Sequence, residues 1–360
     1  MEMFKNASAT PLSRRAVLGA GLFGAAMLAS PSIRRASAEE NALYVNTWGG
    51  DWEASVKKFL FEPFTADTGI EIRTVSPISF AKLAAQKTTG VYEFDVTTLG
   101  VADVARANGA GLLETLEGHV DTSKLWEGAI YENGLATHGF ATQMAYNAAK
   151  FPEGLKNWSD FFNVEKFPGN RSLQRHAARV LAIALLADGV PADQLFPYDL
   201  DRAFASLDRI KDHVRVWWTA GPQARQILTD GEVDMAGLWD SDAFGAKEAS
   251  KEPIEIVWDQ AVVDKACWIV AKDSPRAENG FKLISHIGQN AEGLAKFCIA
   301  DQNGPMNPKS FDFIPAEVAA RMPRMPTHPE HLARAVMLDG AKLLPQLDEL
   351  STRFESWVGI

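Results

Sequence analysis

The chain has 360 residues, of which 46 are acidic and 36 are basic, so its formal net charge is −10 at pH 7. An acidic protein repels phosphate backbones, which argues against nucleic acid as a partner. The same charge is compatible with a cationic small-molecule ligand, and ordinary solubility explains it equally well.

The first 38 residues have the layout of a cleavable export signal. The pair Arg14 and Arg15 precedes an apolar run over 16–29, and the small residues 36–38 follow it. The arginine pair resembles the twin-arginine export signal. The apolar run is shorter than the roughly 20 residues that a membrane-spanning helix needs. We therefore expect a signal that is removed before Glu39 and a mature protein in the periplasm, rather than a membrane anchor.

The chain that follows is longer than ~250–300 residues, the size at which one hydrophobic core usually divides. It is therefore expected to form two lobes. Strand-like runs alternate with helical patterns in its first part, at 42–47, 52–66, 70–75, 80–88 and 94–99. This alternation predicts βαβ units, a parallel sheet and the α/β class. Ligands of such sheets bind beyond the carboxyl ends of the strands, which here are the turns 48–51, 76–79 and 100–103.

The remaining elements continue the alternation. Further helices are expected at 177–187, 199–211, 222–228, 279–287 and 291–298. Further strands are expected at 140–146, 215–218, 233–238, 254–258 and 268–271. A tight turn is expected over 304–308, and the tail after Pro315 is expected to be mostly helical.

Signatures of catalysis and of metal or cofactor binding are absent from the sequence. There is no G-x-S-x-G, H-E-x-x-H, P-loop or G-x-G-x-x-G pattern, so we expect no cofactor and no metal. The two cysteines, Cys267 and Cys298, lie in apolar surroundings. An oxidising compartment would allow a disulfide between them, and two buried thiols are equally compatible with the sequence.

Tryptophan stands out, with ten residues in the chain. Several lie at the ends of expected strands, and acidic residues stand near three of them: Asp51 near Trp48, Asp240 and Asp242 after Trp239, and Asp259 after Trp258. Core packing is the ordinary role of any one tryptophan. An indole face also attracts an ammonium group by ~0.5–2 kcal/mol. The repeated pairing of tryptophan with carboxylates therefore points to an aromatic site for an amine.

The order of these elements resembles the extracellular solute-binding proteins of bacterial ABC importers, in the spermidine- and putrescine-binding branch. The stretches that carry the resemblance are residues 48–50, 64–70, 94–114, 184–190, 216–223, 230–234 and 304–307. The resemblance implies a two-lobed α/β periplasmic binding protein of type II, in which each lobe is a central sheet flanked by helices. A ligand cleft and a hinge would lie between the lobes. One lobe would comprise 39–144 and 260–306, and the other 145–259 and 307–360.

The resemblance also implies where the ligand would bind. Polyamine sites of this family use tryptophans and acids at strand ends, and Trp48 and Trp239 stand at matching positions. The candidate ligand-binding residues are Trp48, Gly49, Asp51, Arg175, Trp218, Trp239, Asp240, Asp242, Asp259 and Asp264.

Two departures from the family pattern affect the expected ligand. Gly50 stands where polyamine binders usually carry an acid, and Asp51 follows it. Residues 239–242 read Trp-Asp-Ser-Asp, whereas the family commonly has Trp-Asn-Gly-Ser or Trp-Asn-Gly-Arg. Asp242 would repel a ligand carboxylate, which favours a cation such as putrescine or spermidine. Arg175, with His176 beside it, keeps open a zwitterion such as γ-aminobutyrate.

The resemblance implies a monomeric protein that delivers a small amine to the permease and ATPase complex of an importer and performs no chemistry. Two other classes stay open on the sequence. An exported enzyme on the same scaffold would need a Ser, Cys or His facing the cleft with a shifted pKa. A sensor subunit would bind the ligand and signal to a membrane partner.

Overall fold

The computed structural model describes residues 41–319 and 329–359. The expected export signal, residues 1–38, lies outside these residues. None of the helices in the described ranges combines the length and the apolar character that crossing a membrane requires.

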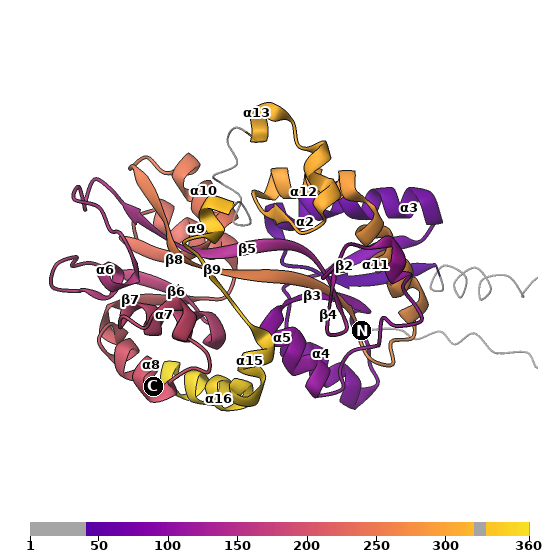
Figure 1. Ribbon diagram of the computed structural model, residues 1–360, viewed down its shortest axis with the longest axis horizontal. Coiled ribbons are helices and arrows are strands. Elements are labelled where there is room, and N and C mark those ends of the chain that lie inside the picture. The colour runs from indigo at the N-terminus through magenta and orange to yellow at the C-terminus, as the bar shows by residue number, and fades with distance from the viewer. Residues whose placement is uncertain (1–40, 320–328, 360) are drawn as a thin grey trace, which may run out of the picture. The chain divides into compact units, whose positions relative to one another are not determined.

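The strands form one sheet in the order β2-β1-β3-β9-β5-β8-β6-β7, with β4 and β10 paired to β5 and β11 paired to β9. Figure 1 shows β5 and β9 running through the middle, with the other strands on either side. The strands are β1 (Ala42–Asn46), β2 (Glu71–Val75), β3 (Val96–Gly100), β4 (Ile130–Tyr131), β5 (Gly134–Asn147), β6 (Arg171–Gln174), β7 (Val214–Trp218), β8 (Met235–Trp239), β9 (Ile254–Val270), β10 (Gly304–Pro305) and β11 (Val336–Met337).

The sheet is mixed, so the expectation of a parallel sheet is correct only within each half. Strands β1 and β3 are parallel, as are β6 with β7 and β6 with β8. The pairs β3–β9, β5–β9 and β5–β8 are antiparallel. Two small parallel sheets are thus joined by a central antiparallel pair.

Strand β9 of this central pair also differs from the sequence prediction. The sequence predicted separate strands at 254–258 and 268–271, whereas β9 is one strand of 17 residues. The polar stretch beginning at Asp259 does not end the strand, because β5 pairs with β9 on both sides of it, over Ile254–Val257 and again from Val262 onward. Gln260 has a positive φ of 59°, and the register shifts between Thr142 and Met144 of β5 mark the same irregular region. A bulge of this kind bends the strand pair without ending it.

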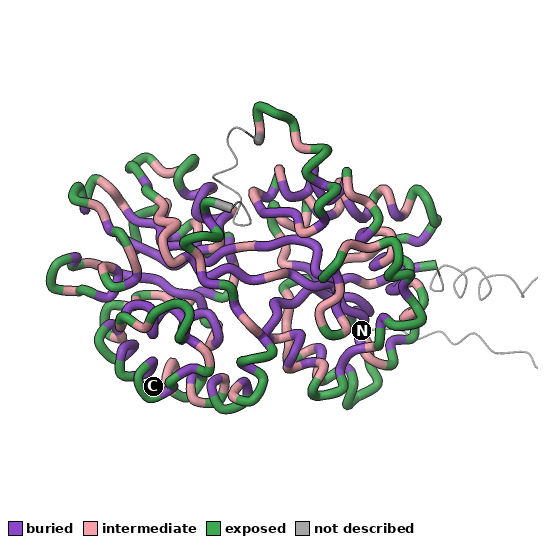
Figure 2. Tube along the Cα trace, viewed as in Figure 1, coloured by how far each residue is buried: buried purple, intermediate pink, exposed green. Residues whose placement is uncertain are grey.

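Helices cover the sheet, and their outer faces are exposed while β5 and β9 are mostly buried (Figure 2). The helices are α2 (Gly50–Val56), α3 (Glu62–Thr68), α4 (Phe80–Thr89), α5 (Val101–Gly109), α6 (Trp158–Phe162), α7 (Ala177–Ala187), α8 (Leu200–Asp208), α9 (Gly221–Thr229), α10 (Asp240–Ala249), α11 (Ala277–Gln289), α12 (Ala291–Asp301), α13 (Ala316–Ala319), α14 (Pro329–Leu332), α15 (Gly340–Leu343) and α16 (Leu347–Val358). A π-helical segment, Lys57–Phe61, joins α2 to α3, so the helix expected over 52–66 is continuous.

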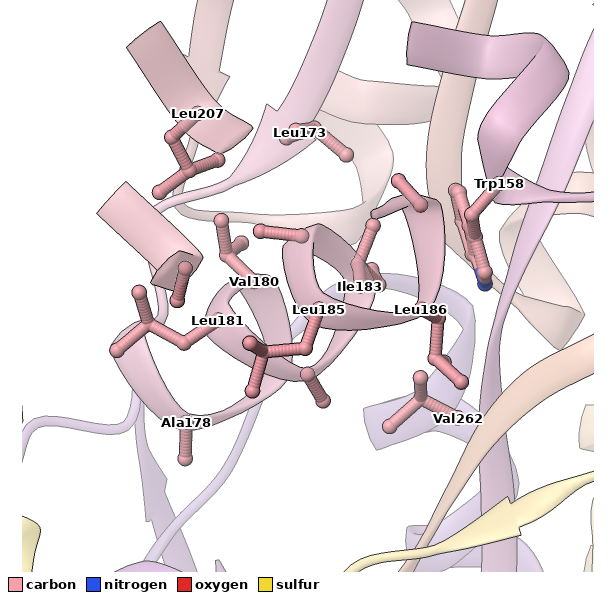
Figure 3. Close-up of a cluster of buried hydrophobic side chains, with 14 of the residues drawn as sticks. Trp158, Leu173, Ala178, Val180, Leu181, Ile183, Leu185, Leu186, Leu207 and Val262 are labelled. Carbon is pink, nitrogen blue, oxygen red and sulfur yellow. The ribbon is translucent and has the colours of Figure 1, made fainter. Parts of the chain in front are cut away.

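Each half of the sheet has its own apolar core. Helix α7 is apolar on all sides, and its residues are buried among Trp158, Leu173 and Leu207 on one side of the β5–β9 pair (Figure 3). On the other side, Phe64, Phe297 and Trp268 belong to a second core. Two cores joined by long shared strands are the arrangement that chain length and element order led us to expect.

Both cysteines are free thiols in this structure. Cys267 lies in β9 and Cys298 in α12, and both are fully buried. Of the two alternatives left open by the sequence, the structure contains the unlinked one.

A buried ion pair ties α7 to the central strands. The Arg179 guanidinium donates to an Asp264 carboxylate oxygen at 2.8 Å, and both side chains are almost completely buried. The other oxygen of Asp264 accepts the backbone N–H of Val101, the first residue of α5, at 3.0 Å. Arg179 also donates to Gln174 at 3.0 Å and lies 4.9 Å from the centre of the Phe140 ring. One carboxylate therefore connects β9 with helices from both halves.

We expect Asp264→Ala to lower the free energy of unfolding by about 3–5 kcal/mol, because it leaves the Arg179 charge buried and unpaired. The control is Glu355→Ala, which removes the exposed partner of Arg175 and should cost about 0–1 kcal/mol. Urea denaturation of both variants measures the difference. Similar losses in the two variants would contradict the role given to Asp264.

Candidate functional site

A cavity of about 290 Å³ lies between the two halves of the sheet. Its walls come from the segments that follow β1, β7 and β8, from the middle of β5 and β9, and from the end of α12. The lining residues are Trp48, Gly49, Asp51, Trp52, His138, Phe140, Gly221, Pro222, Arg225, Trp239, Asp240, Ser241, Asp242, Gly245, Glu248, Ala266, Ala300, Asp301, Gln302 and Asn303. The segments after β1, β7 and β8 lie beyond the carboxyl ends of parallel strands, where ligands of α/β sheets bind.

The turn after β1 delivers Asp51 and Trp52 to this cavity. Gly49 has φ 78° and ψ −171°, a conformation essentially restricted to glycine, and it immediately precedes α2. This lets the chain turn sharply from the strand into the helix. Trp52 then stacks on the buried Trp268 with ring centres 5.9 Å apart.

Aromatic rings form one wall of the cavity. The ring of Trp239, at the end of β8, lies edge-on to Trp48 and to Trp218, each at 5.1 Å between ring centres. It also meets Phe140 at 6.2 Å. Trp218 is fully buried behind Trp239 and donates its indole N–H to the Gly237 carbonyl at 2.9 Å. Trp218 therefore supports the wall without lining the cavity.

Three buried carboxyl groups face the cavity from two helices. Asp240 and Asp242 lie in the first turn of α10, and Asp301 is the last residue of α12. Their exposed fractions are 1%, 8% and 6%. One oxygen of Asp240 accepts the Ser241 backbone N–H at 3.1 Å, while its second oxygen has no hydrogen-bond partner among the described residues. Asn303 donates its amide N–H to Asp301.

A glycine makes room for one of these groups. A Cβ built at Gly221, the first residue of α9, would overlap the Asp242 carboxylate. Only glycine at this position lets Asp242 lie against the start of α9. The same wall therefore needs both Gly221 and Asp242.

Burial and mutual repulsion favour the neutral forms of these acids. Burial, and next the neighbouring Asp301, raises the pKa of Asp240 well above its ordinary value. Burial, and next Asp242, does the same for the pKa of Asp301. Burial raises the pKa of Asp242 to about 7, against a lowering by Arg225. The three carboxyl groups cannot all carry charge in the empty cavity at neutral pH without a large electrostatic cost.

Among the described residues, one guanidinium lines the cavity, against five carboxyl groups. Arg225 extends from α9 over Gly245, where a Cβ would approach its Cδ and Nη1 to 2.8 Å. It donates to Asp51 at 3.0 Å, and the Asp51 side chain is 81% exposed. This ion pair joins α9 to α2 and holds the guanidinium toward Asp51, from where it lowers the pKa of Asp242 only in part.

His138 supplies no compensating charge. Its ring is buried against Phe297, with ring centres 4.9 Å apart, and lies near Trp52 at 6.4 Å. Burial lowers the pKa of His138 to about 3, so the imidazole is neutral at pH 7. It lines the cavity as an aromatic and hydrogen-bonding group. No set of His, Cys, Asp and Glu side chains within 41–319 and 329–359 is arranged to hold a metal ion.

The structure brings six of the ten candidate residues to the cavity: Trp48, Gly49, Asp51, Trp239, Asp240 and Asp242. Trp218 lies directly behind them. Arg175 lies outside the lining and pairs with Glu355 at 2.5 Å on the surface. Asp264 belongs to the buried ion pair described above, and Asp259 lies half-buried in β9 outside the lining.

Several lining residues were not among the sequence candidates. Trp52 and Arg225 lie in helices for which the sequence pattern indicated only helical periodicity, and Asp301 ends α12 beyond the helix expected over 291–298. His138 lies in a part of β5 that was not expected to be strand. Asp301 had one usable signal, since it lies shortly before the turn 304–308, part of which carries the family resemblance.

Comparison with known proteins identifies the family. Residues 60–327 match the model of the bacterial extracellular solute-binding proteins. The chain belongs to this family.

Its relatives agree with that assignment. The γ-aminobutyric acid-binding protein of Pseudomonas aeruginosa is 30% identical over 344 residues, covering 93% of this chain and 95% of the relative. The spermidine/putrescine-binding periplasmic protein of Escherichia coli is 25% identical over 269 residues, covering 69% of this chain and 73% of the relative. A periplasmic binding protein of Agrobacterium tumefaciens R10, solved with agropinic acid, superposes with a TM-score of 0.81 at 25% identity, covering 89% of this chain and 99% of that one.

These findings confirm the resemblance inferred from the sequence. This solute-binding protein has the two-lobed α/β fold of the periplasmic binding proteins, with β5 and β9 crossing between the lobes. It is the solute-binding component of an ABC transporter, and its family and relatives are binding proteins rather than enzymes.

The buried acids predict an unusual dependence of stability on pH. Between about pH 4 and 7, folded Asp242 binds a proton that the unfolded chain has lost, so the free energy of unfolding falls as pH rises. The loss from this residue is up to about 4 kcal/mol. Asp240 and Asp301, whose pKa values burial also raises, add to the decline in the same direction. Urea denaturation of the ligand-free protein at about pH 5 and about pH 8 measures it.

Asp242→Asn should reduce this decline, because an amide does not titrate in that range. The exposed acid Asp230, changed to Asn, is the control and should leave the decline as in the wild type. Equal pH dependence in the wild type and Asp242→Asn would contradict the assignment.

Proposed function

We propose that this solute-binding protein works in the periplasm, after removal of residues 1–38, and captures a small diamine or polyamine such as putrescine or spermidine for its permease. The bound ligand would lie between lobes formed by 39–144 with 260–306 and by 145–259 with 307–360. The observation that carries the proposal is the convergence of Asp240, Asp242 and Asp301 on one cavity.

Charge is the main support for an amine. A buried carboxylate without a partner costs several kcal/mol, and a ligand ammonium removes that cost by pairing with it. Within the described lining the only fixed positive charge is Arg225, which already pairs with Asp51. The remaining acidic excess favours a ligand with more than one positive charge.

The aromatic side chains and the volume of the cavity also favour an amine ligand. Ammonium groups and the methylene chain between them both pack well on indole rings, and Trp48, Trp52 and Trp239 line the cavity. A volume of about 290 Å³ is at the small end of ligand sites and suits a short linear molecule. The E. coli relative is named for spermidine and putrescine.

The second candidate is a short amino acid with a terminal ammonium, such as γ-aminobutyrate. The P. aeruginosa relative is named for that compound. Arg225 favours this alternative, because its guanidinium lines the cavity and could pair with a carboxylate. Arg175, the residue first considered for that role, is engaged by Glu355 outside the cavity. Both candidate ligands share the ammonium group that the buried acids would bind.

Trp239→Ala and Asp242→Asn should each weaken putrescine binding by about 10- to 100-fold, or roughly 1.4–2.8 kcal/mol. The first removes the central ring of the aromatic wall, and the second removes a carboxylate. Isothermal titration calorimetry measures the affinities, and circular dichroism checks that both variants are folded. Asp230→Asn is the control. Unchanged affinity in both test variants would remove this cavity as the ligand site.

Arg225→Gln separates the two candidate ligands. It should weaken γ-aminobutyrate binding by about tenfold or more, because a carboxylate loses its cationic partner. It should tighten putrescine binding, because a positive charge leaves the neighbourhood of the ligand. Calorimetry with both compounds gives the comparison. Wild-type protein that binds γ-aminobutyrate and not putrescine would replace the first candidate by the second.

A further inference from the structure

The buried acids of the cavity raise the question of what neutralises them before a ligand arrives. Asp240 from α10 and Asp301 from α12 line the same cavity and repel one another electrostatically, and Asp242 adds a third carboxyl group. This inference rests on the proposed function, since it concerns how the same cavity takes up an ammonium ligand.

Among the described residues, no charged group around this cluster forms an ion pair with its carboxyl groups, and Arg225 lowers the pKa of Asp242 only in part. Helix α2 contributes Asp51, which is a further acid at the rim. Helix α9 contributes Arg225, which Asp51 already holds. Strand β5 contributes His138, which is buried and neutral, and the outer part of α10 contributes the exposed Glu248.

Helix α12 adds one more titratable group beside the acids. The thiol of Cys298 is fully buried, and burial together with Asp301 and Asp240 raises the pKa of this thiol. The thiol therefore stays neutral. Within the described residues, the deep part of the cavity holds three carboxyl groups and no cation.

We propose that protons occupy the Asp240–Asp242–Asp301 cluster in the empty cavity and that an ammonium ligand displaces them, so that ligand binding releases protons and strengthens as pH rises. In this exchange a neutral carboxyl group loses its O–H proton to solvent and becomes a carboxylate. The carboxylate then pairs with the ligand ammonium, which keeps all of its own protons. Positive charge enters as the ligand and leaves as H⁺, so the net charge in the cavity is conserved.

Geometry supports this exchange independently of any titration. The second oxygen of Asp240 is buried without a hydrogen-bond donor from the described residues, and a carboxylate oxygen would not be stable there without one. A protonated carboxyl group or a bound ammonium removes that problem. The raised pKa values of all three acids, with Asp242 at about 7, agree with the same conclusion.

The exchange would make ligand capture sensitive to acidity. Each proton released increases the observed affinity by about tenfold per pH unit, within the range where the cluster is protonated in the empty protein. The gain from each acid ends where that acid loses its proton in the empty protein, at about pH 7 for Asp242, and no gain extends past pH ~10, where an alkyl ammonium deprotonates. The protein would therefore retain its amine at neutral pH and lose affinity in acidic surroundings.

Calorimetry tests this directly. Putrescine is titrated into the mature protein at about pH 7 in buffers that differ in ionisation enthalpy, at one ionic strength. When the observed enthalpy of binding is plotted against the ionisation enthalpy of the buffer, the slope equals the number of protons exchanged on binding. We expect release of about one proton per bound ammonium. Asp242→Asn should reduce the release, and Asp230→Asn should leave it as in the wild type.

A second measurement does not depend on the ligand. Infrared difference spectra of the ligand-free wild type against Asp240→Asn, at about pH 7, should contain the C=O stretch of a protonated carboxyl group. Putrescine binding without proton release would overturn the proposal, and so would the absence of this band. Failure to bind putrescine, spermidine and γ-aminobutyrate would instead refute the proposed function, and the infrared band would still decide whether the cluster holds protons.

Discussion

Strands β5 and β9 pair antiparallel along nearly their whole length, and each strand serves both lobes. One end of β9 pairs with β3, while the far end of β5 pairs with β8. Because both lobes are attached to the same two strands, the segments that follow β1 and β8 come to lie on opposite sides of one cavity. The bulges in this pair are where it bends, and the hydrogen-bond ladder between the two strands is locally interrupted there. The cavity, its aromatic wall and its acids all depend on this shared pair.

The sequence predicted the elements whose signals are local, and it missed those whose structure depends on neighbouring strands. Helix α7 was expected over 177–187, and its bounds match the structure, because its apolar run stands between a capping side chain, His176, and Gly189. Strand β6 was missed because Arg171–Gln174 is short and polar in composition, and its buried character comes from its neighbours β7 and β8. Strand β9 was divided because its strand-like pattern stops at Trp258, whereas in the structure β5 pairs with β9 both before and after the stretch that follows.

The same distinction separates the site residues that the sequence predicted from those that it missed. Trp48, Asp51, Trp239 and Asp242 follow strands directly, so the rule that ligands bind at carboxyl strand ends was enough to select them. Asp301 and Arg225 come from helices whose placement depends on how the two lobes meet, which local sequence does not encode. Asp264 shows the opposite case: its charge is taken up by Arg179, a residue 85 positions away in the chain. A lone acid in a sequence does not reveal whether its partner is another side chain or a ligand.

That difference in partners explains how one protein can contain two kinds of buried carboxylate. Asp264 accepts hydrogen bonds from Arg179 and from the backbone of Val101, so its charge is compensated and rigidly held. Asp240 has one oxygen without a donor in the described structure, and its neighbours Asp242 and Asp301 are acids as well. The first arrangement stabilises the folded state, whereas the second destabilises it until a cation arrives. Arg225 compensates the second cluster only in part, at Asp242, because its guanidinium is paired with Asp51. On the proposed function, this separation of the guanidinium from the deep acids is what leaves the inner cavity dependent on the ligand for its positive charge.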